Sequence, residues 1–346
     1  MKIKGPHVGP REIDTVYFGG GTPSAISPDL LISLVDSLKE NGFHPKKGAE
    51  ITLEVNPGTL KAKDFDKLLH YGFTRFSVGA QTFNDKLLKA TGRLHTSDET
   101  RETLKLLRER GVNYSADILF SLPRQSLDDL SRDLDEISKF TPPHISPYGL
   151  NIPEGHPYSR NRAPEGEQVE MFSVIERRLK EMGLERYEIS NFAKVGFESR
   201  HNLIYWNDHE YWGLGMSSHS YLRHSKWGSR FWNPRSIEAF VNHIDKAADG
   251  GWNLKDHLNQ FGEILQEHQA LTDYFHISLR KREGLSPEKF KKKFRKTLDP
   301  FAKKKLSALI SRGLLEQFQE NYRLTAEGIL LSNLVFSEFT FLKDDL

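Results

Sequence analysis

A run of three glycines followed by hydroxyl residues is the part of this sequence best suited to hold a ligand. Gly19–Gly21 follow an apolar and aromatic stretch, and Thr22 and Ser24 come directly after them. Glycine has no Cβ, so its backbone approaches a ligand closely and its N–H groups stay accessible. The run predicts a ligand-binding turn at the end of a strand, although a plain strand-to-helix turn has the same composition.

Polar side chains also stand at the ends of the later predicted strands. In chain order they are Glu54, Asn56, Ser77, Gln81, Arg93 and Asp117. Ligands of parallel β/α arrays bind at the carboxyl ends of the strands. Each residue alone could be a cap or an ion-pair partner, but several inward carboxylates and amides cost desolvation unless something polar binds them. Carboxylates suit ribose hydroxyls or an amine, and a guanidinium suits a carboxylate.

Short β-branched or aromatic runs alternate with amphipathic stretches from Asp14 to about Pro147, which is typical of a parallel sheet. The predicted strands are Thr15–Phe18, Glu50–Val55, Arg75–Val78, Tyr114–Phe120 and His144–Tyr148. Capping signals mark the ends of the helices between these strands. They are Ser27 before Pro28, the pair Thr96 and Glu99, and Gly111 as a stop.

The composition is that of a globular protein. The 346 residues carry a formal net charge of +2, which supports neither a polyanion-binding protein nor an acidic disordered one. No apolar run is long enough to span a bilayer, and the polar first twelve residues do not resemble a signal peptide. The sequence contains no cysteine, which excludes disulfides and thiolate-held metals within it and favours the cytoplasm.

The second half of the chain is patterned differently. An amphipathic helix is predicted from Gly166 to Met182, and an irregular segment rich in aromatic and polar residues extends from Tyr187 to Trp232. From Ser236 onward the pattern is helical. The last part predicts a helix at residues 303–313, a strand pair at 314–324 and a helix at 325–336, which resembles a winged-helix module.

Five motifs occur in the order and spacing of a known family. They are Gly19-Gly20-Gly21-Thr22-Pro23-Ser24, Glu54-Val55-Asn56-Pro57-Gly58, Ser77-Val78-Gly79-Ala80-Gln81-Thr82-Phe83, Gly92-Arg93-Leu94-His95 and the stretch from Asp117 to Gln125. Together they resemble the radical S-adenosylmethionine family, in the branch that holds the oxygen-independent coproporphyrinogen III oxidases and the HemW-type heme chaperones. The resemblance covers most of the chain.

The resemblance implies an α/β fold in three parts. Residues 1–165 would form a partial parallel β/α barrel of the radical S-adenosylmethionine type, which has six strands in the family and lacks the first one here. Residues 166–235 would form an α/β region that caps the barrel. Residues 236–346 would form the small C-terminal helical, winged-helix-like domain of the coproporphyrinogen oxidase branch.

The resemblance also implies ligands for particular residues. S-adenosylmethionine would lie across the strand ends, with its methionyl amino group at Gly20, Gly21 and Thr22. Its carboxylate would meet Arg93. Its ribose and nearby polar atoms would meet Glu54, Gln81 and Asp117.

A second motif, from Arg200 to Trp206, resembles the His-Asn-x-x-Tyr-Trp motif linked to heme binding in this branch. A neutral imidazole is a common axial ligand of heme iron, and the aromatic residues Tyr205 and Trp206 could pack on a porphyrin. His201 is therefore the candidate heme ligand. The alternative is a histidine buried in an aromatic core.

The family's 4Fe-4S cluster is held by a Cys-x-x-x-Cys-x-x-Cys loop after its first strand, and no such loop occurs here. We predict no catalytic residue and no metal ligand, so enzymatic activity stays open. A start assigned too far downstream would explain the missing strand, and so would a degenerate relative that binds S-adenosylmethionine or heme without radical chemistry. The exposed sheet edge could pair with another chain, as in a homodimer.

The leading functional hypothesis is a heme chaperone whose partners are heme and a heme-accepting protein. Oxidative decarboxylation by a coproporphyrinogen III oxidase and a non-catalytic scaffold are the alternatives. The basic cluster Lys289, Lys291, Lys292, Lys293 and Arg295 raises nucleic-acid binding as another class. The balanced net charge and the lack of a base-reading motif argue against it.

Overall fold

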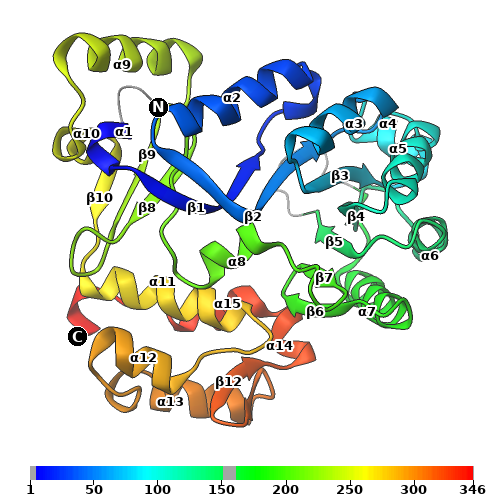
Figure 1. Ribbon diagram of the computed structural model, residues 1–346. Helices are drawn as coiled ribbons and strands as arrows, with labels where there is room; N and C mark the ends of the chain where they lie inside the picture. The colour runs from blue at the N-terminus through cyan, green and yellow to red at the C-terminus, as the bar shows by residue number, and fades with distance from the viewer. Residues whose placement is uncertain (1–4, 151–160, 346) are drawn as a thin grey trace. The chain divides into compact units, whose positions relative to one another are not determined.

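The computed structural model describes residues 5–150 and 161–345, which form two compact units (Figure 1). One unit comprises Glu12–Asp36 and Pro45–His201, and we call it the barrel unit. The other comprises the remaining described residues, and we call it the C-terminal unit. The division of the chain at residues 165 and 235 stays a prediction.

The barrel unit alternates strands and helices. In chain order these are β1 (Arg11–Phe18), α2 (Pro28–Glu40), β2 (Phe43–Val55), α3 (Ala62–Tyr71), β3 (Arg75–Gln81), α4 (Asp85–Ala90), α5 (Ser97–Glu109), β4 (Asn113–Phe120), α6 (Leu127–Ser138), β5 (His144–Gly149), α7 (Glu165–Glu181), β6 (Glu185–Glu188) and β7 (Asn191–Ala193). All five predicted strands are present. The first two begin earlier than predicted, because the polar residues at their starts still adopt extended backbone.

The sheet has seven strands in the order β1-β2-β3-β4-β5-β7-β6. Strands β2 to β5 pair in parallel, whereas β5 pairs with β7 and β6 with β7 in antiparallel fashion. The predicted partial parallel β/α barrel is confirmed as a curled, half-barrel sheet. The two short strands β6 and β7 extend the sheet beyond the parallel strands, and the sequence pattern did not separate them from the surrounding irregular segment.

Helices cover one face of this sheet, and the apolar core lies between them. Leu53, Phe76 and Ala116 on the strands are fully buried, as are Phe65 on α3 and Leu104 on α5. Burying one large apolar side chain stabilises a fold by about 1.5–3 kcal/mol. Since strand side chains alternate between faces, the residues between these positions point to the opposite face, which we call the inner face.

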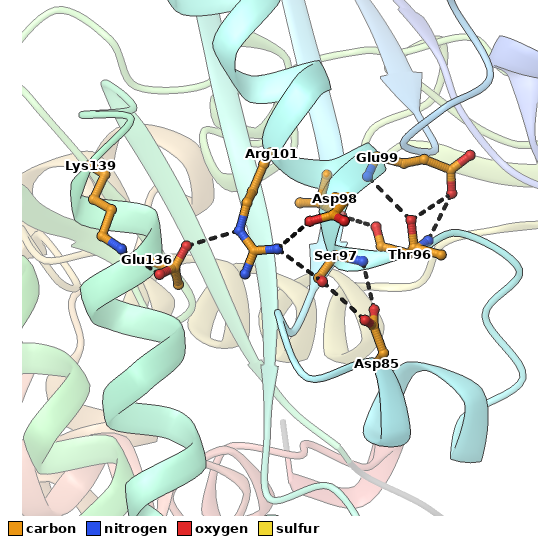
Figure 2. Close-up of polar contacts among 9 residues, drawn as sticks. Asp85, Thr96, Ser97, Asp98, Glu99, Arg101, Glu136 and Lys139 are labelled. Atoms are coloured by element: carbon orange, nitrogen blue, oxygen red, sulfur yellow. Dashed lines mark hydrogen bonds and ion pairs between the residues drawn. The ribbon is translucent and has the colours of Figure 1, made fainter.

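Two helix starts show how local sequence positions the loops of the barrel unit. Thr96 and Glu99 form the predicted capping box of α5, and Asp85 of α4 accepts a hydrogen bond of 2.7 Å from the Ser97 backbone N–H (Figure 2). Arg101 of the same helix pairs with Asp98 at 2.7 Å and with Glu136 of α6 at 3.0 Å. The end of the loop that precedes α5 is thereby fixed to α4 and α6, and this loop carries Arg93.

The C-terminal unit is mainly helical. It contains β8 (His219–Leu222), β9 (Ser229–Trp232), α9 (Ile237–Gly250), α10 (Leu254–Phe261), β10 (Gly262–Ile264), α11 (Glu267–Arg280), α12 (Pro287–Phe294), α13 (Asp299–Ser311), β11 (Leu315–Phe318), β12 (Asn321–Leu324), α14 (Ala326–Leu330) and α15 (Ser332–Glu338). Strands β8 to β10 form a small antiparallel sheet that the sequence did not predict.

The predicted helix, strand pair and helix near the C-terminus are present, with one difference. Strands β11 and β12 pair in antiparallel fashion after α13, as expected for a wing. The following helix is broken at Leu331, which leaves α14 and α15 as separate short helices. Among the described helices, none combines the length and the apolar character that a membrane span requires.

Candidate functional site

The glycine turn is exposed at the end of β1 and needs its glycines for two different reasons. Gly20 and Gly21 have φ values of +80° and +65°, which glycine adopts without strain, and open space surrounds their missing Cβ positions. Gly19 instead lies against its neighbours. A Cβ there would be 2.5 Å from Tyr17 Cε1 and 2.8 Å from Glu54 Oε1. The turn is thus packed at its base and open at its tip.

Glu54 at the end of β2 holds this turn in place. Its Oε2 accepts a hydrogen bond of 3.0 Å from the Gly20 backbone N–H, and its Oε1 accepts one of 2.7 Å from the Tyr17 hydroxyl. Both carboxylate oxygens are therefore engaged by residues of β1 and its turn. The resemblance implies a ligand contact for Glu54, which stays a prediction, and the structure shows that Glu54 positions the turn.

Hydroxyl and amide groups join the same turn to the loop after β2. Asn56 donates a hydrogen bond of 3.2 Å from Nδ2 to Thr22 Oγ1. The hydroxyl of the buried Ser24 accepts a hydrogen bond of 3.0 Å from the Asn56 backbone N–H. The hydroxyls and amides predicted from the motifs therefore lie together, although these residues are more than thirty positions apart.

Gln81 at the end of β3 adjoins this cluster. The residue is buried and has a φ of 62°, a conformation that non-glycine residues adopt rarely. A Cβ on Gly79 would lie 2.9 Å from Gln81 Nε2 and 3.5 Å from Asn56 Oδ1. Glycine at position 79 thus leaves room for both amides, which places Gln81 beside the loop after β2.

Asp117 lies on β4, one strand further along the sheet. The Ser77 hydroxyl donates a hydrogen bond of 3.2 Å to its Oδ2, and Ser146 of β5 also bonds to the carboxyl. Desolvation raises the pKa of Asp117 to about 6, against the lowering effect of these hydroxyls and of Arg75. A carboxyl with such a pKa changes protonation near neutral pH, so its hydrogen-bonding role there depends on pH.

Arg93 lies on the loop between α4 and α5. The neighbouring His95 is buried, and its ring bonds to the backbone of Ala80, which places this loop beside the end of β3. Burial lowers the pKa of His95, so its ring is neutral at physiological pH. Within the described part of the chain, the Arg93 guanidinium makes no ion pair, and it is partly exposed. It can therefore receive an anionic group.

His201 lies at the start of α8 (Arg200–Trp206), on the inner face of the sheet. Its Nδ1 is 2.7 Å from Thr15 Oγ1, and its ring stacks on Tyr17 with centroids 4.8 Å apart. The buried carboxylate of Glu50 accepts a hydrogen bond of 3.0 Å from the His201 backbone N–H, which caps this helix. Burial, assisted by the charge of Arg75, lowers the pKa of His201 to about 4.

Arg75 is one of the site residues that the motifs did not reveal. It is 3% exposed at the start of β3, and its Nε has no hydrogen-bond partner. Its charge lowers the pKa of His144 as well as that of His201, in both cases after the larger effect of burial. Thr15, Tyr17 and Glu50 were also missed. All of them occupy inner-face positions, so alternation along the predicted strands is the signal that could have found them.

The described residues do not contain a metal centre. No group of three or more His, Asp or Glu side chains in the described ranges could hold a metal ion. The sequence contains no cysteine, so the thiolates that ordinarily hold an iron-sulfur cluster are absent from it. The donor set therefore does not fit a 4Fe-4S cluster.

Comparison with known proteins identifies the family. Residues 7–137 match the radical SAM superfamily, and residues 265–331 match the HemN C-terminal domain. The chain is 32% identical to "Heme chaperone HemW" of Bacillus subtilis over 339 residues, which is 96% of this chain and 86% of that protein. The chain belongs to the HemW family. HemW of Lactococcus lactis is also 32% identical, over 97% of this chain and 86% of that protein.

A solved structure supports the fold of this HemW-family chain over nearly its whole length. Coproporphyrinogen III oxidase (HemN) of Escherichia coli, described as a radical SAM enzyme, matches 95% of this chain with a TM-score of 0.79. The match covers 78% of that protein at 20% identity. It shows a shared fold and does not bear on activity. The HemW family resemblance and the HemN-like fold predicted from the motifs are thus confirmed.

Proposed function

We propose that this chain is a heme chaperone, which binds heme and passes it to an acceptor protein. The observation that supports this function is the similarity to HemW heme chaperones over 96% and 97% of the chain. This similarity includes the segment with the His-Asn-x-x-Tyr-Trp motif, which lies in α8 with His201 as its second residue. Neither the oxidase activity of HemN nor a scaffold role has a comparable supporting observation, because HemN shares 20% identity with the chain.

His201 is the proposed heme ligand. Its hydrogen bond to Thr15 and its stack on Tyr17 hold the imidazole in one orientation, as the outer partners of metal-binding histidines do. Its pKa of about 4 keeps the ring neutral at physiological pH, which is the form that binds iron. Both features favour a ligand role.

S-adenosylmethionine is the proposed second ligand, at the turn after β1. The open space at Gly20 and Gly21 suits its amino group, and Arg93 would receive its carboxylate. Thr22, Glu54, Gln81 and Asp117 would supply polar contacts to the methionyl end, the ribose and nearby atoms. S-adenosylmethionine supplies a methyl or adenosyl group to chemistry when bound. Since the donor set does not fit a cluster, we derive no radical step for this chain.

Heme titration followed by absorption spectroscopy tests the ligand assignment. We expect His201→Ala to lose the spectrum of histidine-ligated heme, and His70→Ala, which removes an exposed histidine of α3, to keep it. An identical heme spectrum in wild type and His201→Ala would contradict the assignment. Transfer of bound heme to an apo-globin tests the chaperone activity, and its failure with heme-loaded wild type would contradict that activity.

A separate assay distinguishes the alternatives. After anaerobic iron and sulfide treatment, the chain as given should form no 5′-deoxyadenosine from S-adenosylmethionine. Formation of 5′-deoxyadenosine together with porphyrinogen decarboxylation would instead support an oxidase. Binding of neither heme nor S-adenosylmethionine would support a scaffold.

A further inference from the structure

The C-terminal unit concentrates positive charge on two helices that follow one another in the chain. Residues 289–305, which comprise most of α12 and the first half of α13, contain nine lysines and arginines and one acidic residue, Asp299. The whole chain carries a formal net charge of +2, so the average conceals this local excess. A cluster of basic residues on adjacent helices is the electrostatic pattern expected of a surface that binds a polyanion.

Among the described residues, carboxylates neutralise four of these nine cations. The ion pairs are Lys289–Glu283 at 3.1 Å, Lys293–Asp208 at 2.5 Å, Lys296–Glu267 at 2.6 Å and Lys303–Asp299 at 3.4 Å. Lys305 instead donates a hydrogen bond of 2.6 Å to the backbone carbonyl of Glu338. The other four cations are exposed and make no ion pair in the described part of the chain. They are Lys291, Lys292, Arg295 and Lys304, and we call them the basic face.

The apolar faces of both helices are already occupied by the core of the unit. Phe290 and Phe294 of α12 are buried and contact Tyr274 of α11, with ring centroids 6.0 and 5.4 Å apart. The buried residues of α13 include Ala302, Leu306 and Leu309. An amphipathic helix that binds a membrane inserts its apolar face into the lipid. Because the core covers these faces, the charge pattern favours a polyanion in solution over a membrane.

The outward face of α13 carries small side chains next to its cations. Lys304, Ser307, Ala308 and Ser311 are exposed and follow the three- and four-residue spacing of one helix face. The major groove of B-form DNA is about 12 Å wide and admits an α-helix. The deep, narrow major groove of an RNA duplex cannot be read by side chains. A slim, basic helix face therefore favours DNA over RNA.

Backbone pairing fixes the two helices between strands. The Leu285 N–H donates a hydrogen bond of 2.7 Å to the Tyr322 carbonyl, and the Tyr322 N–H donates one of 3.0 Å to the Leu285 carbonyl. The segment before α12 is thereby joined to β12, which pairs with β11 after α13. The exposed Glu320 lies in the turn between β11 and β12, where its charge would repel phosphates. The helices, and not this turn, are therefore the surface for a polyanion.

We propose that α12 and α13 bind double-helical DNA through its phosphate backbone, without reading its sequence. The basic face would contact phosphates, and the small residues of α13 would enter the major groove. A lysine is a compact point charge, which suits phosphate contacts that position a protein on the duplex. The inference uses none of the residues proposed to bind heme or S-adenosylmethionine, so it does not depend on the proposed function.

Fluorescence anisotropy of a short labelled duplex with the full chain tests this inference. Each phosphate contact contributes about −0.9 to the slope of log affinity against log salt concentration. Four contacts should therefore lower the affinity by roughly two orders of magnitude between about 50 and 200 mM salt. Two duplexes of unrelated sequence should bind with equal affinity. A strong preference for one of them would overturn the sequence-independent mode.

The test variant is Lys291→Gln/Arg295→Asn/Lys304→Gln. Arg295 has a φ of 58°, and asparagine tolerates this left-handed conformation well. Lys292 is retained because it also lines a cavity with Trp206 of the heme-motif segment. We expect a salt slope that is smaller by about three and an affinity reduced roughly tenfold or more at 50 mM salt. Heme binding should stay unchanged.

The matched control is Arg235→Asn/Lys246→Gln/Lys255→Gln. These three residues are exposed in the same unit and make no ion pair within residues 5–150 and 161–345. The control therefore removes the same charge from a different part of the surface. It should leave both the affinity and the salt slope for DNA unchanged. An equal loss in the two variants would mean that overall charge attracts the DNA, which would overturn the assignment to α12 and α13.

The remaining outcomes concern the partner. No binding of DNA by wild type at about 50 mM salt would overturn the proposal. Tighter binding of an RNA duplex of the same sequence would show that the partner is RNA. Equal binding of poly-glutamate or of anionic lipid vesicles would show that the face accepts any acidic surface, which also contradicts the proposal. None of these results bears on heme, whose binding is tested separately with His201→Ala.

Discussion

The phenol ring of Tyr17 lies nearly parallel to the imidazole of His201, with ring centroids 4.8 Å apart and an angle of 15° between the rings. The hydroxyl of the same tyrosine donates a hydrogen bond of 2.7 Å to Glu54, which in turn holds the Gly20 backbone N–H. One side chain thereby connects the proposed heme ligand to the turn proposed to bind S-adenosylmethionine.

Tyr17→Phe should separate these two contacts. The phenylalanine ring keeps the stack on His201 but cannot bond to Glu54, so the Gly20 turn loses part of its support. We expect weaker S-adenosylmethionine binding in calorimetry, a loss of stability of about 1 kcal/mol, and an unchanged heme spectrum. Tyr17→Leu removes both contacts and should alter the heme spectrum too. Equal S-adenosylmethionine affinity in wild type and Tyr17→Phe would contradict the role assigned to the hydroxyl.

Asp117→Asn should change how stability depends on pH. Because desolvation raises the folded-state pKa of Asp117 to about 6, the folded protein binds this proton more tightly than the unfolded chain does. Its contribution to stability is full below about pH 3.9 and is lost as the pH rises through about 6. The stability of wild type minus that of Asp117→Asn should therefore fall by up to about 3 kcal/mol between pH 4 and pH 7.

Denaturant unfolding of both proteins at several pH values measures this difference. Asp133, which is buried on α6, also has its pKa raised to about 6 by desolvation. It is present in both proteins, so its effect cancels in the comparison. A difference that stays constant from pH 4 to pH 7 would rule out the pKa shift of Asp117.

Arg75→Met should raise the pKa of His201. The buried guanidinium disfavours the imidazolium form, although burial itself is the larger cause of the low value near 4. The pKa should move part of the way toward the unperturbed value of about 6.5, as measured by NMR titration of the ring. Because Arg75 also favours the buried Asp117 carboxylate, its removal should lower stability at neutral pH. A His201 pKa that does not move would show that Arg75 does not act on it.

Thr96→Ala should weaken both α5 and the neighbouring Arg93 loop. Thr96 caps this helix reciprocally with Glu99, and loss of such a cap costs about 1 kcal/mol. Ser126→Ala removes an equivalent cap from α6 and serves as the control, because that helix does not carry the Arg93 loop. Calorimetry should show reduced S-adenosylmethionine affinity only for Thr96→Ala. A similar reduction in both variants would mean that general destabilisation, and not the loop, is responsible.

Much of the barrel unit could be predicted from the sequence, because its strands and helix starts depend on local chemistry. The alternation around Glu50–Val55 and the capping pair of Thr96 and Glu99 involve residues close together in the chain. Glu54 and Gln81 were found for the same reason, because each follows an apolar run that predicts where a strand ends. Asp117 instead lies within β4 (Asn113–Phe120) and not at its end.

The contacts of His201 were decided by the tertiary structure. Its partner Thr15 is 186 positions away, and no local pattern indicates that these residues meet. Arg75 is similar, since its sequence neighbours are those of an ordinary strand and only its place in the sheet makes it a buried cation. The sequence by itself determined which residues line the inner face. The curled sheet, in which Thr15, Tyr17 and His201 come together within the barrel unit, decided which of those residues touch.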